Sequence, residues 1–231
     1  MAAEPSGAKR PQRTRELTAD LQDGVGQRLR AERERHGLSL RQLARRLSMS
    51  PSALSQIETG RSRPSVGTLY AIVTERGMSL DELFGSPRVG PVAPVELVDE
   101  PGAGPVQRAR TRKRLELESG VRWERLTPTA EPSTDFLYVV YEVGGASSRA
   151  ETYMRHTGRE YGIVLSGRLR VSLGFDEEHE LGPGDSIAFD SLRPHRLENV
   201  GDEPVHAVWF VAGREDSDHR KQALDAGSPD S

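Results

Sequence analysis

The positions of the hydrophobic residues divide the chain into a helical first part and a strand-rich second part. Between residues 21 and 85 apolar side chains recur every three or four positions, as at Leu40, Leu43 and Leu47, which is the spacing of one helix face. From about residue 108 to residue 213 short apolar runs alternate with glycine, proline and aspartate, a rhythm typical of an antiparallel sandwich or barrel. The clearest runs are LYVVYEV, YGIVLSG, LRVSLGF, SIAFD and VHAVWFVA.

Helix starts in the first part are marked by serines that satisfy free backbone N–H groups. Ser39 opens a capping box, because a glutamine follows three residues later, and Ser50 is followed by proline, the favoured first helical residue. A further helix precedes these and ends at Gly37. The sequence therefore predicts five helices, four of which begin at Ser39, Ser50, Ser65 and Ser79.

Five segments follow from these patterns. The two ends are polar and lack hydrophobic periodicity, so they are expected to be disordered, and five prolines make the segment between the folded parts a semi-stiff linker. The predicted segments are a disordered arm (1–20), a helical domain (21–85), a linker (86–107), a β domain (108–213) and a tail (214–231).

Composition favours a cytoplasmic protein with two folded domains. The 231 residues include no cysteine, which excludes disulfides and thiol catalysis and fits a reducing compartment. No apolar run approaches the roughly 20 residues of a membrane span, and the N-terminus lacks the apolar segment of a secretory signal. Residues 24–85 hold 10 basic against 6 acidic side chains, whereas residues 86–231 hold 18 against 25. That division suits a nucleic-acid reader with a separate partner domain, although two solvated surfaces could show it by chance.

Only Ser48 and Met49 separate the two helices predicted after Ser39 and Ser50. Two short helices joined so tightly must cross steeply, which is the helix-turn-helix geometry. The apolar spacing and the closing I-E-x-G-R-x-x-P-S at residues 57–65 resemble the lambda-repressor/xenobiotic-response-element class of DNA-binding domains. In that class a glycine usually stands at the position of Ser48, so a positive φ there would cost roughly 1 kcal/mol.

The resemblance implies how this domain would contact DNA. Gln56 would read adenine in the major groove, and Arg33 and Glu58 would form the ion pair that ties the first helix to the third. Taken singly, exposed serines and arginines would be solvated surface, so the inference depends on the whole set. The residues implied to face base edges are Ser50, Ser52, Ala53, Ser55 and Gln56, and those implied to hold phosphates are Arg41, Gln42, Arg61 and Arg63.

The β domain resembles the cupin superfamily across residues 135–211. His156 stands four residues before Glu160, a glycine follows seven residues after Glu160, and His195 opens an H-x-x-x-N sequence. The resemblance is closest to sensor barrels fused to helix-turn-helix domains, including polyamine-responsive repressors. It implies an all-β double-stranded β-helix barrel following the all-α, five-helix domain.

In cupins the inward-facing ligands are two histidines and a glutamate from the first motif and a histidine from the second. Met154 replaces the first histidine here, so the resemblance leaves His156, Glu160 and His195. Two imidazoles and a carboxylate suit Fe(II) and could hold Zn(II), Ni(II) or Mn(II). The same three groups could instead hydrogen-bond an organic ligand without a metal. Tyr153 and Met154 complete the expected effector pocket. The aromatic candidates for its walls, although residues of this kind are more often plain barrel core, are Trp123, Tyr138, Tyr141, Tyr153, Phe189 and Trp209.

The sequence thus predicts a transcriptional regulator that binds double-stranded operator DNA and responds to a small-molecule effector in its barrel. It is expected to be a homodimer joined through residues 108–213, because one small reading domain rarely binds tightly enough alone. The alternative is a non-haem Fe(II)-dependent oxygenase or epoxidase that carries a helix-turn-helix domain. We favour the regulator, and no catalytic residue is assigned, because an enzyme would not need an intact DNA-reading helix.

Overall fold

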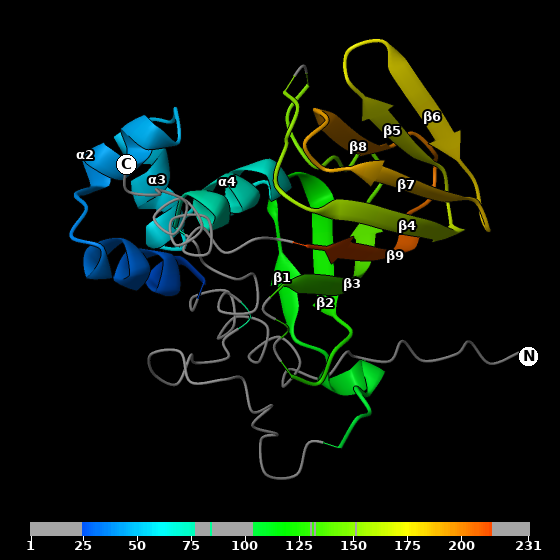
Figure 1. The fold of residues 1–231 in the computed structure, drawn as a ribbon, viewed down its shortest axis with the longest axis horizontal. Helices are drawn as coiled ribbons and strands as arrows, with labels where there is room; N and C mark the ends of the chain where they lie inside the picture. The colour runs from blue at the N-terminus through cyan, green and yellow to red at the C-terminus, as the bar shows by residue number, and fades with distance from the viewer. Residues whose placement is uncertain are drawn as a thin grey trace, which may run out of the picture.

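The computed structural model describes residues 25–76, 84, 104–129, 131, 133–150 and 152–213. Its N-terminal part contains a helix at residues 25–35, followed by α2 (Leu40–Arg46), α3 (Pro51–Glu58) and α4 (Val66–Arg76) (Figure 1). The fifth predicted helix lies outside the described residues, which include only Phe84 from that stretch. No helix in the described ranges is long and apolar enough to cross a membrane.

The predicted helix starts at Ser39, Ser50 and Ser65 are confirmed. Each serine hydroxyl oxygen accepts a hydrogen bond from the backbone N–H three residues further along, at 3.3, 3.1 and 3.1 Å respectively. Ser39 is part of a full capping box, because the side-chain oxygen of Gln42 accepts a hydrogen bond from the backbone N–H of Ser39 at 2.8 Å. Each cap satisfies backbone donors that the first turn of a helix leaves free.

Two residues with positive φ determine where the first helices end. Gly37 has a φ of 63° and follows the helix at residues 25–35, as a glycine C-cap does. Ser48 has a φ of 53° in the turn between α2 and α3. The serine therefore occupies the left-handed region that the class resemblance assigned to glycine, and pays the steric cost of about 1 kcal/mol for its Cβ.

A buried ion pair joins the first helix to α3. The guanidinium of Arg33 donates to both carboxylate oxygens of Glu58, at 2.6 and 2.9 Å, and donates to the carbonyl of Leu38 at 2.8 Å. Both charged side chains are buried, so the ion pair expected from the class resemblance is confirmed. The helices also approach closely at Gly26, where a Cβ would lie 2.4 Å from the carbonyl oxygen of Ile57.

Nine strands form two antiparallel sheets in the described part of the C-terminal domain (Figure 1). The larger sheet has the order β1-β2-β3-β9-β4-β7 and the smaller the order β6-β5-β8. The strands are β1 (Arg114–Glu116), β2 (Val121–Arg125), β3 (Thr134–Tyr141), β4 (Arg159–Ser166), β5 (Leu169–Leu173), β6 (Glu177–Leu181), β7 (Ser186–Asp190), β8 (His195–Asn199) and β9 (Val205–Ala212).

Alternation along the central strands separates the barrel interior from its outer surface. In β9 the residues Val205, Ala207, Trp209 and Val211 are buried while the intervening ones are partly exposed. In β4 buried and exposed positions also alternate, and Glu160 is among the buried ones. The period of two therefore carries this glutamate into the barrel interior.

Helix α4 lies between the other helices and the barrel (Figure 1). The buried hydrophobic residues of the two parts form one continuous cluster, in which Leu54 and Leu69 belong to the helices and Trp123 and Met154 to the barrel. The helical part is therefore packed against the barrel as well as joined to it through the chain, and the sequence did not predict this contact.

Candidate functional site

The residues predicted to read DNA lie on the exposed face of α3 and in the segments that flank it. Leu54 and Ile57 of α3 are buried, which turns the opposite side of the helix to solvent. Of the residues expected to face base edges, Ser50, Ser52 and Gln56 are exposed, while Ala53 and Ser55 are partly exposed. The hydroxyl oxygen of Ser50 already accepts the N-cap hydrogen bond, which leaves its O–H and one remaining lone pair for other partners.

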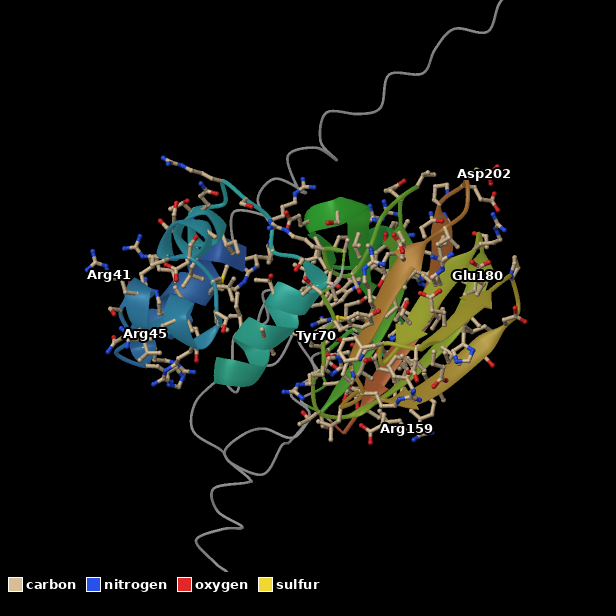
Figure 2. All side chains as sticks on the ribbon, turned by 90° about the horizontal axis from the view of Figure 1, so that it is seen from above. Arg41, Arg45, Tyr70, Arg159, Glu180 and Asp202 are labelled. Carbon is tan, nitrogen blue, oxygen red and sulfur yellow. The ribbon has the colours of Figure 1, made fainter. Side chains whose placement is uncertain are left out.

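Exposed arginines surround this helix. Residues 40–65 contain five arginines and one acidic residue, Glu58, whose charge is neutralised by Arg33. The predicted phosphate contacts Arg41, Arg61 and Arg63 are exposed, and Figure 2 shows Arg41 and Arg45 at the end of the molecule remote from the barrel. A uniformly cationic surface beside an exposed short helix has the electrostatics of a DNA-backbone contact.

A second site lies inside the barrel, where His156, Glu160 and His195 meet. His156 precedes β4, Glu160 lies on β4, and His195 begins β8, so the two sheets bring the three residues together. The Oε1 atom of Glu160 lies 3.0 Å from Nε2 of each histidine. Each of the three residues is at most 3% exposed, so solvent does not reach this cluster.

Backbone carbonyls fix the protonation of both imidazole rings. Nδ1 of His195 donates to the carbonyl of Arg193 at 2.8 Å, and Nδ1 of His156 donates to the carbonyl of Thr157 at 3.1 Å. In a neutral imidazole the remaining nitrogen, Nε2, then presents a lone pair. Both Nε2 atoms and Oε1 of Glu160 are buried and have no hydrogen-bond partner.

Three lone-pair atoms at such short range repel one another unless positive charge lies between them. Burial alone would raise the pKa of Glu160, but when both imidazoles carry a proton on Nε2 their hydrogen bonds and charge outweigh it and hold this pKa well below its usual range. When the rings are neutral, a cation between the three atoms would supply the positive charge instead. The carboxylate is therefore ionised. Two ligand atoms bound to one ion at about 2.1 Å lie about 3 Å apart when the bonds are perpendicular, so the spacing fits a divalent cation.

The carboxylate of Glu160 is held in place by Trp209. The indole N–H of Trp209 donates to Oε2 of Glu160 at 2.7 Å. Gly162 makes room for the indole, because a Cβ there would lie 2.0 Å from the ring of Trp209. A ligand that is itself hydrogen-bonded keeps one orientation, which is the usual support of a metal-binding side chain.

The other expected pocket residues occupy different places. Met154 is buried and exchanges both backbone hydrogen bonds with His195. Phe189 packs on the ring of His195 at 5.1 Å, whereas Tyr153 packs against Phe175 at 5.1 Å. Burial, together with the charge of Glu160, raises the pKa of the buried Tyr141.

The two remaining aromatic candidates divide between the interior and the outer surface. The hydroxyl of Tyr138 pairs with Nδ1 of His206 at 2.8 Å on the outer side of the sheet. The buried Trp123 contacts the ring of Tyr70, at 5.6 Å between centroids.

Sequence reasoning missed Tyr70 and Arg45. Tyr70 belongs to α4 of the helical domain, yet its ring stacks on His156 at a centroid distance of 3.9 Å. Its position in the helix matches that of an ordinary core residue, so only the packing of the two domains could reveal the contact. Arg45 is exposed beside the reading helix, and the run of basic residues at the end of α2 was the available signal.

Comparison with known families agrees with the division of the chain into a helical and a β domain. A helix-turn-helix family matches residues 29–83, and a cupin domain family matches residues 137–211. The chain is therefore a DNA-binding transcriptional regulator that combines a helix-turn-helix domain with a cupin domain.

Individual proteins match most of the chain. The chain is 26% identical over 175 residues to the HTH-type transcriptional regulator PuuR of Escherichia coli, covering 76% of this chain and 87% of that protein. A crystal structure of an HTH_3 family transcriptional regulator from Vibrio cholerae matches 85% of this chain and 98% of its own, with a TM-score of 0.58 and 22% identity, and supports the fold. Hydroxypropylphosphonic acid epoxidase from S. wedmorenis matches 83% of this chain and 97% of its own at 21% identity. Its TM-score of 0.40 is too low to carry an argument.

Proposed function

We propose that this regulator recognises a specific operator through α3 and senses a small molecule in its barrel at His156, Glu160 and His195. In the cytoplasm, occupancy of that site would change operator binding. The observation that carries the proposal is the meeting of three buried lone-pair atoms that have no other partner. A bound divalent ion would supply the positive charge that these atoms lack and open positions for oxygen or nitrogen atoms of an effector.

The chain's own groups are arranged to hold such an ion. Backbone carbonyls keep Nε2 of His156 and His195 free of protons in the neutral rings, and Trp209 turns one oxygen of Glu160 toward both. The donor set of two nitrogens and one oxygen fits Fe(II), Zn(II), Ni(II) or Mn(II). Met154 is a weak ligand for hard divalent ions, so the protein would supply only three ligands. The fourth coordination position would be left to water or to the effector.

On DNA, the exposed residues of α3 would distinguish sequences while the arginines fix position. Gln56 and Ser52 are the exposed residues on the face that would enter the major groove, and Arg41, Arg61 and Arg63 would contact phosphates on either side. This division of roles supports a sequence-specific regulator over a protein that only organises DNA.

The same donor set serves Fe(II) oxygenases, which makes an enzyme the second candidate. Against it stands the exposed face of α3 with its flanking arginines, which an oxygenase would not need. We propose that the protein binds its effector without turnover. Sustained oxygen uptake with a metabolite and Fe(II), abolished in Glu160→Ala, would overturn this part of the proposal.

A homodimer would place two reading helices on one face of DNA, about 34 Å apart. The outer face of the larger sheet supports such a dimer, because Tyr161, Ile163 and Phe136 are all more than a third exposed. Beside them a shallow groove of about 340 Å³ is lined by apolar residues of β4, β7 and β9, including Ile187, Val208 and Phe210. An exposed apolar surface of this kind commonly marks an interface between subunits.

The decisive experiment is elemental analysis of the full chain purified without chelators, compared with His195→Ala. We expect close to one divalent ion per wild-type chain and loss of the ion in the variant. Less than about a tenth of an ion per chain would instead indicate a pocket for an organic ligand alone. Addition of the identified ion to the protein on operator DNA then measures whether occupancy changes affinity.

A further inference from the structure

Tyr70 brings the helical domain into direct contact with the cluster in the barrel. Its ring lies nearly parallel to that of His156, with 3.9 Å between centroids and 14° between planes. The other side of the contact is closed by Trp123, whose ring meets Tyr70 edge-on at 62°. Tyr70 is only 4% exposed, so the stack is part of the buried interior (Figure 2 labels Tyr70 on α4, facing the barrel).

Two backbone hydrogen bonds hold the same end of α4 on the barrel. The carbonyl of Pro64 accepts from the N–H of Glu118 at 2.9 Å, and the N–H of Gly67 donates to the carbonyl of Ser147 at 3.2 Å. Pro64, Gly67 and Tyr70 are three residues apart, so all three contacts lie along one side of the start of α4. Gly67 also faces Met154, because a Cβ built on this glycine would lie in van der Waals contact, at 3.5 Å, with the Cβ of that methionine.

We propose that Tyr70 is a positioning residue of the barrel site, and that its contact with His156 links occupancy of the site to the placement of the DNA-reading helix. The proposal rests on the function proposed above. A cation bound at Nε2 lies in the plane of the imidazole, so the orientation of this plane decides whether His156 can share an ion with Glu160. Tyr70 covers the face of the ring and leaves the Nε2 edge toward Glu160, so it fixes the plane without competing for the lone pair.

The link continues from α4 to the DNA-reading surface. Leu69 of α4 packs in the same buried cluster as Leu54 and Ile57 of α3, so a displacement of α4 would be passed to α3 through close-packed side chains. The segment between them carries Arg61 and Arg63, and Arg63 directly precedes the anchored Pro64. A tilt of the His156 ring therefore shifts α4 against the barrel and changes where the reading helix lies. In a dimer, the same shift alters the distance between the two reading helices.

The first test measures Zn²⁺ affinity of the full-length protein by competition with a chromophoric chelator. Tyr70→Ala should weaken Zn²⁺ binding about 10- to 100-fold, as loss of support around a ligand does. Tyr70→Phe keeps the flat ring and should retain wild-type affinity. Tyr138→Ala is the matched control, because it removes a tyrosine that touches a histidine on the outer surface. Equal affinities of Tyr70→Ala and wild type would overturn the positioning role.

The second test follows hydrogen exchange of the amides of α4 with and without saturating Zn²⁺. Zn²⁺ should change their protection in wild type and in Tyr70→Phe, and the change should be lost in Tyr70→Ala. In Glu160→Gln, Zn²⁺ should also leave the exchange of the α4 amides unchanged. Here the cause is the loss of a metal ligand, while the contact between Tyr70 and His156 is kept. A Zn²⁺ effect on α4 that persists in Tyr70→Ala would overturn the link. If Tyr70→Ala does not fold, Tyr70→Leu fills the space without a stacking ring and replaces it in both tests.

Failure of the metal proposal is distinguishable from failure of the link. If wild type binds no Zn²⁺, His156→Ala perturbs the stack from the barrel side without any metal. The link predicts that His156→Ala changes exchange in α4 in the wild-type background but causes no further change in Tyr70→Ala. Independent, additive effects of the two substitutions would show that the contact transmits nothing.

Discussion

The indole N–H of Trp209 donates a 2.7 Å hydrogen bond to Oε2 of Glu160, and this bond leaves Oε1 facing both His156 and His195. Trp209 comes from β9 and Glu160 from β4, which are adjacent strands, so the pairing of the strands sets the orientation of the carboxylate. The carboxylate of Glu160 is thereby held in one orientation inside the barrel, where a buried carboxylate without a hydrogen-bond partner would destabilise the fold.

Trp209→Phe tests this arrangement. The substitution keeps an aromatic ring and removes the N–H, so Glu160 loses the bond that orients it. We expect metal affinity to fall about 10- to 100-fold and the protein to lose about 1–3 kcal/mol of stability, because Oε2 becomes a buried acceptor without a partner. Chelator competition and denaturant unfolding measure the two effects. Tyr138→Phe removes an aromatic side-chain hydrogen bond on the outer side of the same sheet and should leave metal affinity unchanged; a similar loss of metal affinity in both variants would contradict the specific role of Trp209.

Gln56→Ala tests the base-reading role of α3. Gln56 is exposed on this helix, and its amide would pair with the edge of one base. The variant should bind the preferred operator about 1–3 kcal/mol more weakly and lose its preference at one base pair. Operators selected from a random duplex library, followed by anisotropy titrations, provide the measurement. A wild-type protein without sequence preference would refute the regulator's specificity altogether.

Arg61→Ala should behave differently, because a phosphate contact carries no sequence information. Binding to all duplexes should weaken alike, and the dependence of log K on log salt should flatten by about one unit. Titrations at several salt concentrations measure the slope. Arg30→Ala is a suitable control, since Arg30 lies on the first helix and pairs with Glu34; it should leave the slope unchanged. Loss of preference at a single base pair in Arg61→Ala would show that this arginine reads bases instead.

The buried pair of Arg33 and Glu58 predicts a sharp asymmetry in stability. Arg33→Met leaves the carboxylate of Glu58 buried without its partner, which should cost about 3–5 kcal/mol. The double variant Arg33→Met, Glu58→Leu removes both charges and should recover most of this loss. Denaturant unfolding followed by the helical circular dichroism signal compares the variants. Similar stabilities for the single and double variants would show that loss of Arg33 does not leave the Glu58 carboxylate as an uncompensated buried charge.

Ser48 offers a stabilising substitution. Its φ of 53° is strained for a residue with a Cβ, so Ser48→Gly should relieve about 1 kcal/mol at this turn. The gain is partly offset by the greater freedom of glycine in the unfolded chain. Ser48→Ala keeps the Cβ and should show no such gain. A glycine variant less stable than the alanine variant would mean that the hydroxyl contributes more than the strain costs.

The sequence predicted those features that depend on neighbouring residues or on short motifs. The serine caps and the turn at Ser48 depend only on neighbouring residues. His156 and Glu160 are four residues apart, so one short sequence motif at the start of β4 contains both. The sequence did not predict strand β6, because Glu177–Leu181 is largely exposed and lacks the alternation of apolar and polar residues that a half-buried strand shows. Tyr70 was missed for another reason: its partner lies in a different domain, and no periodicity within α4 encodes which surface that domain will meet.

A single charged substitution on the outer face of the larger sheet tests whether two subunits associate through this face. Ile163 is 39% exposed, pairs with Val208 of the neighbouring strand β9, and lines the groove formed by β4, β7 and β9. Ile163→Glu would bury an unpaired carboxylate if this face joins two subunits, so sedimentation of the full chain should change from dimer to monomer. Leu192→Glu is the control, because Leu192 is 60% exposed outside the strands and does not line this groove.

The consequence for DNA follows from geometry. A monomer presents one reading helix, whereas a dimer engages two half-sites, so Ile163→Glu should weaken binding to a palindromic operator far more than binding to a single half-site. Operator binding and effector binding must also be reciprocal in the dimer, each changing the affinity of the other by the same factor, about 5- to 150-fold. An Ile163→Glu protein that remains dimeric would place the interface elsewhere. A wild-type dimer whose effector affinity is the same with and without operator would leave the contact between Tyr70 and His156 without a regulatory role.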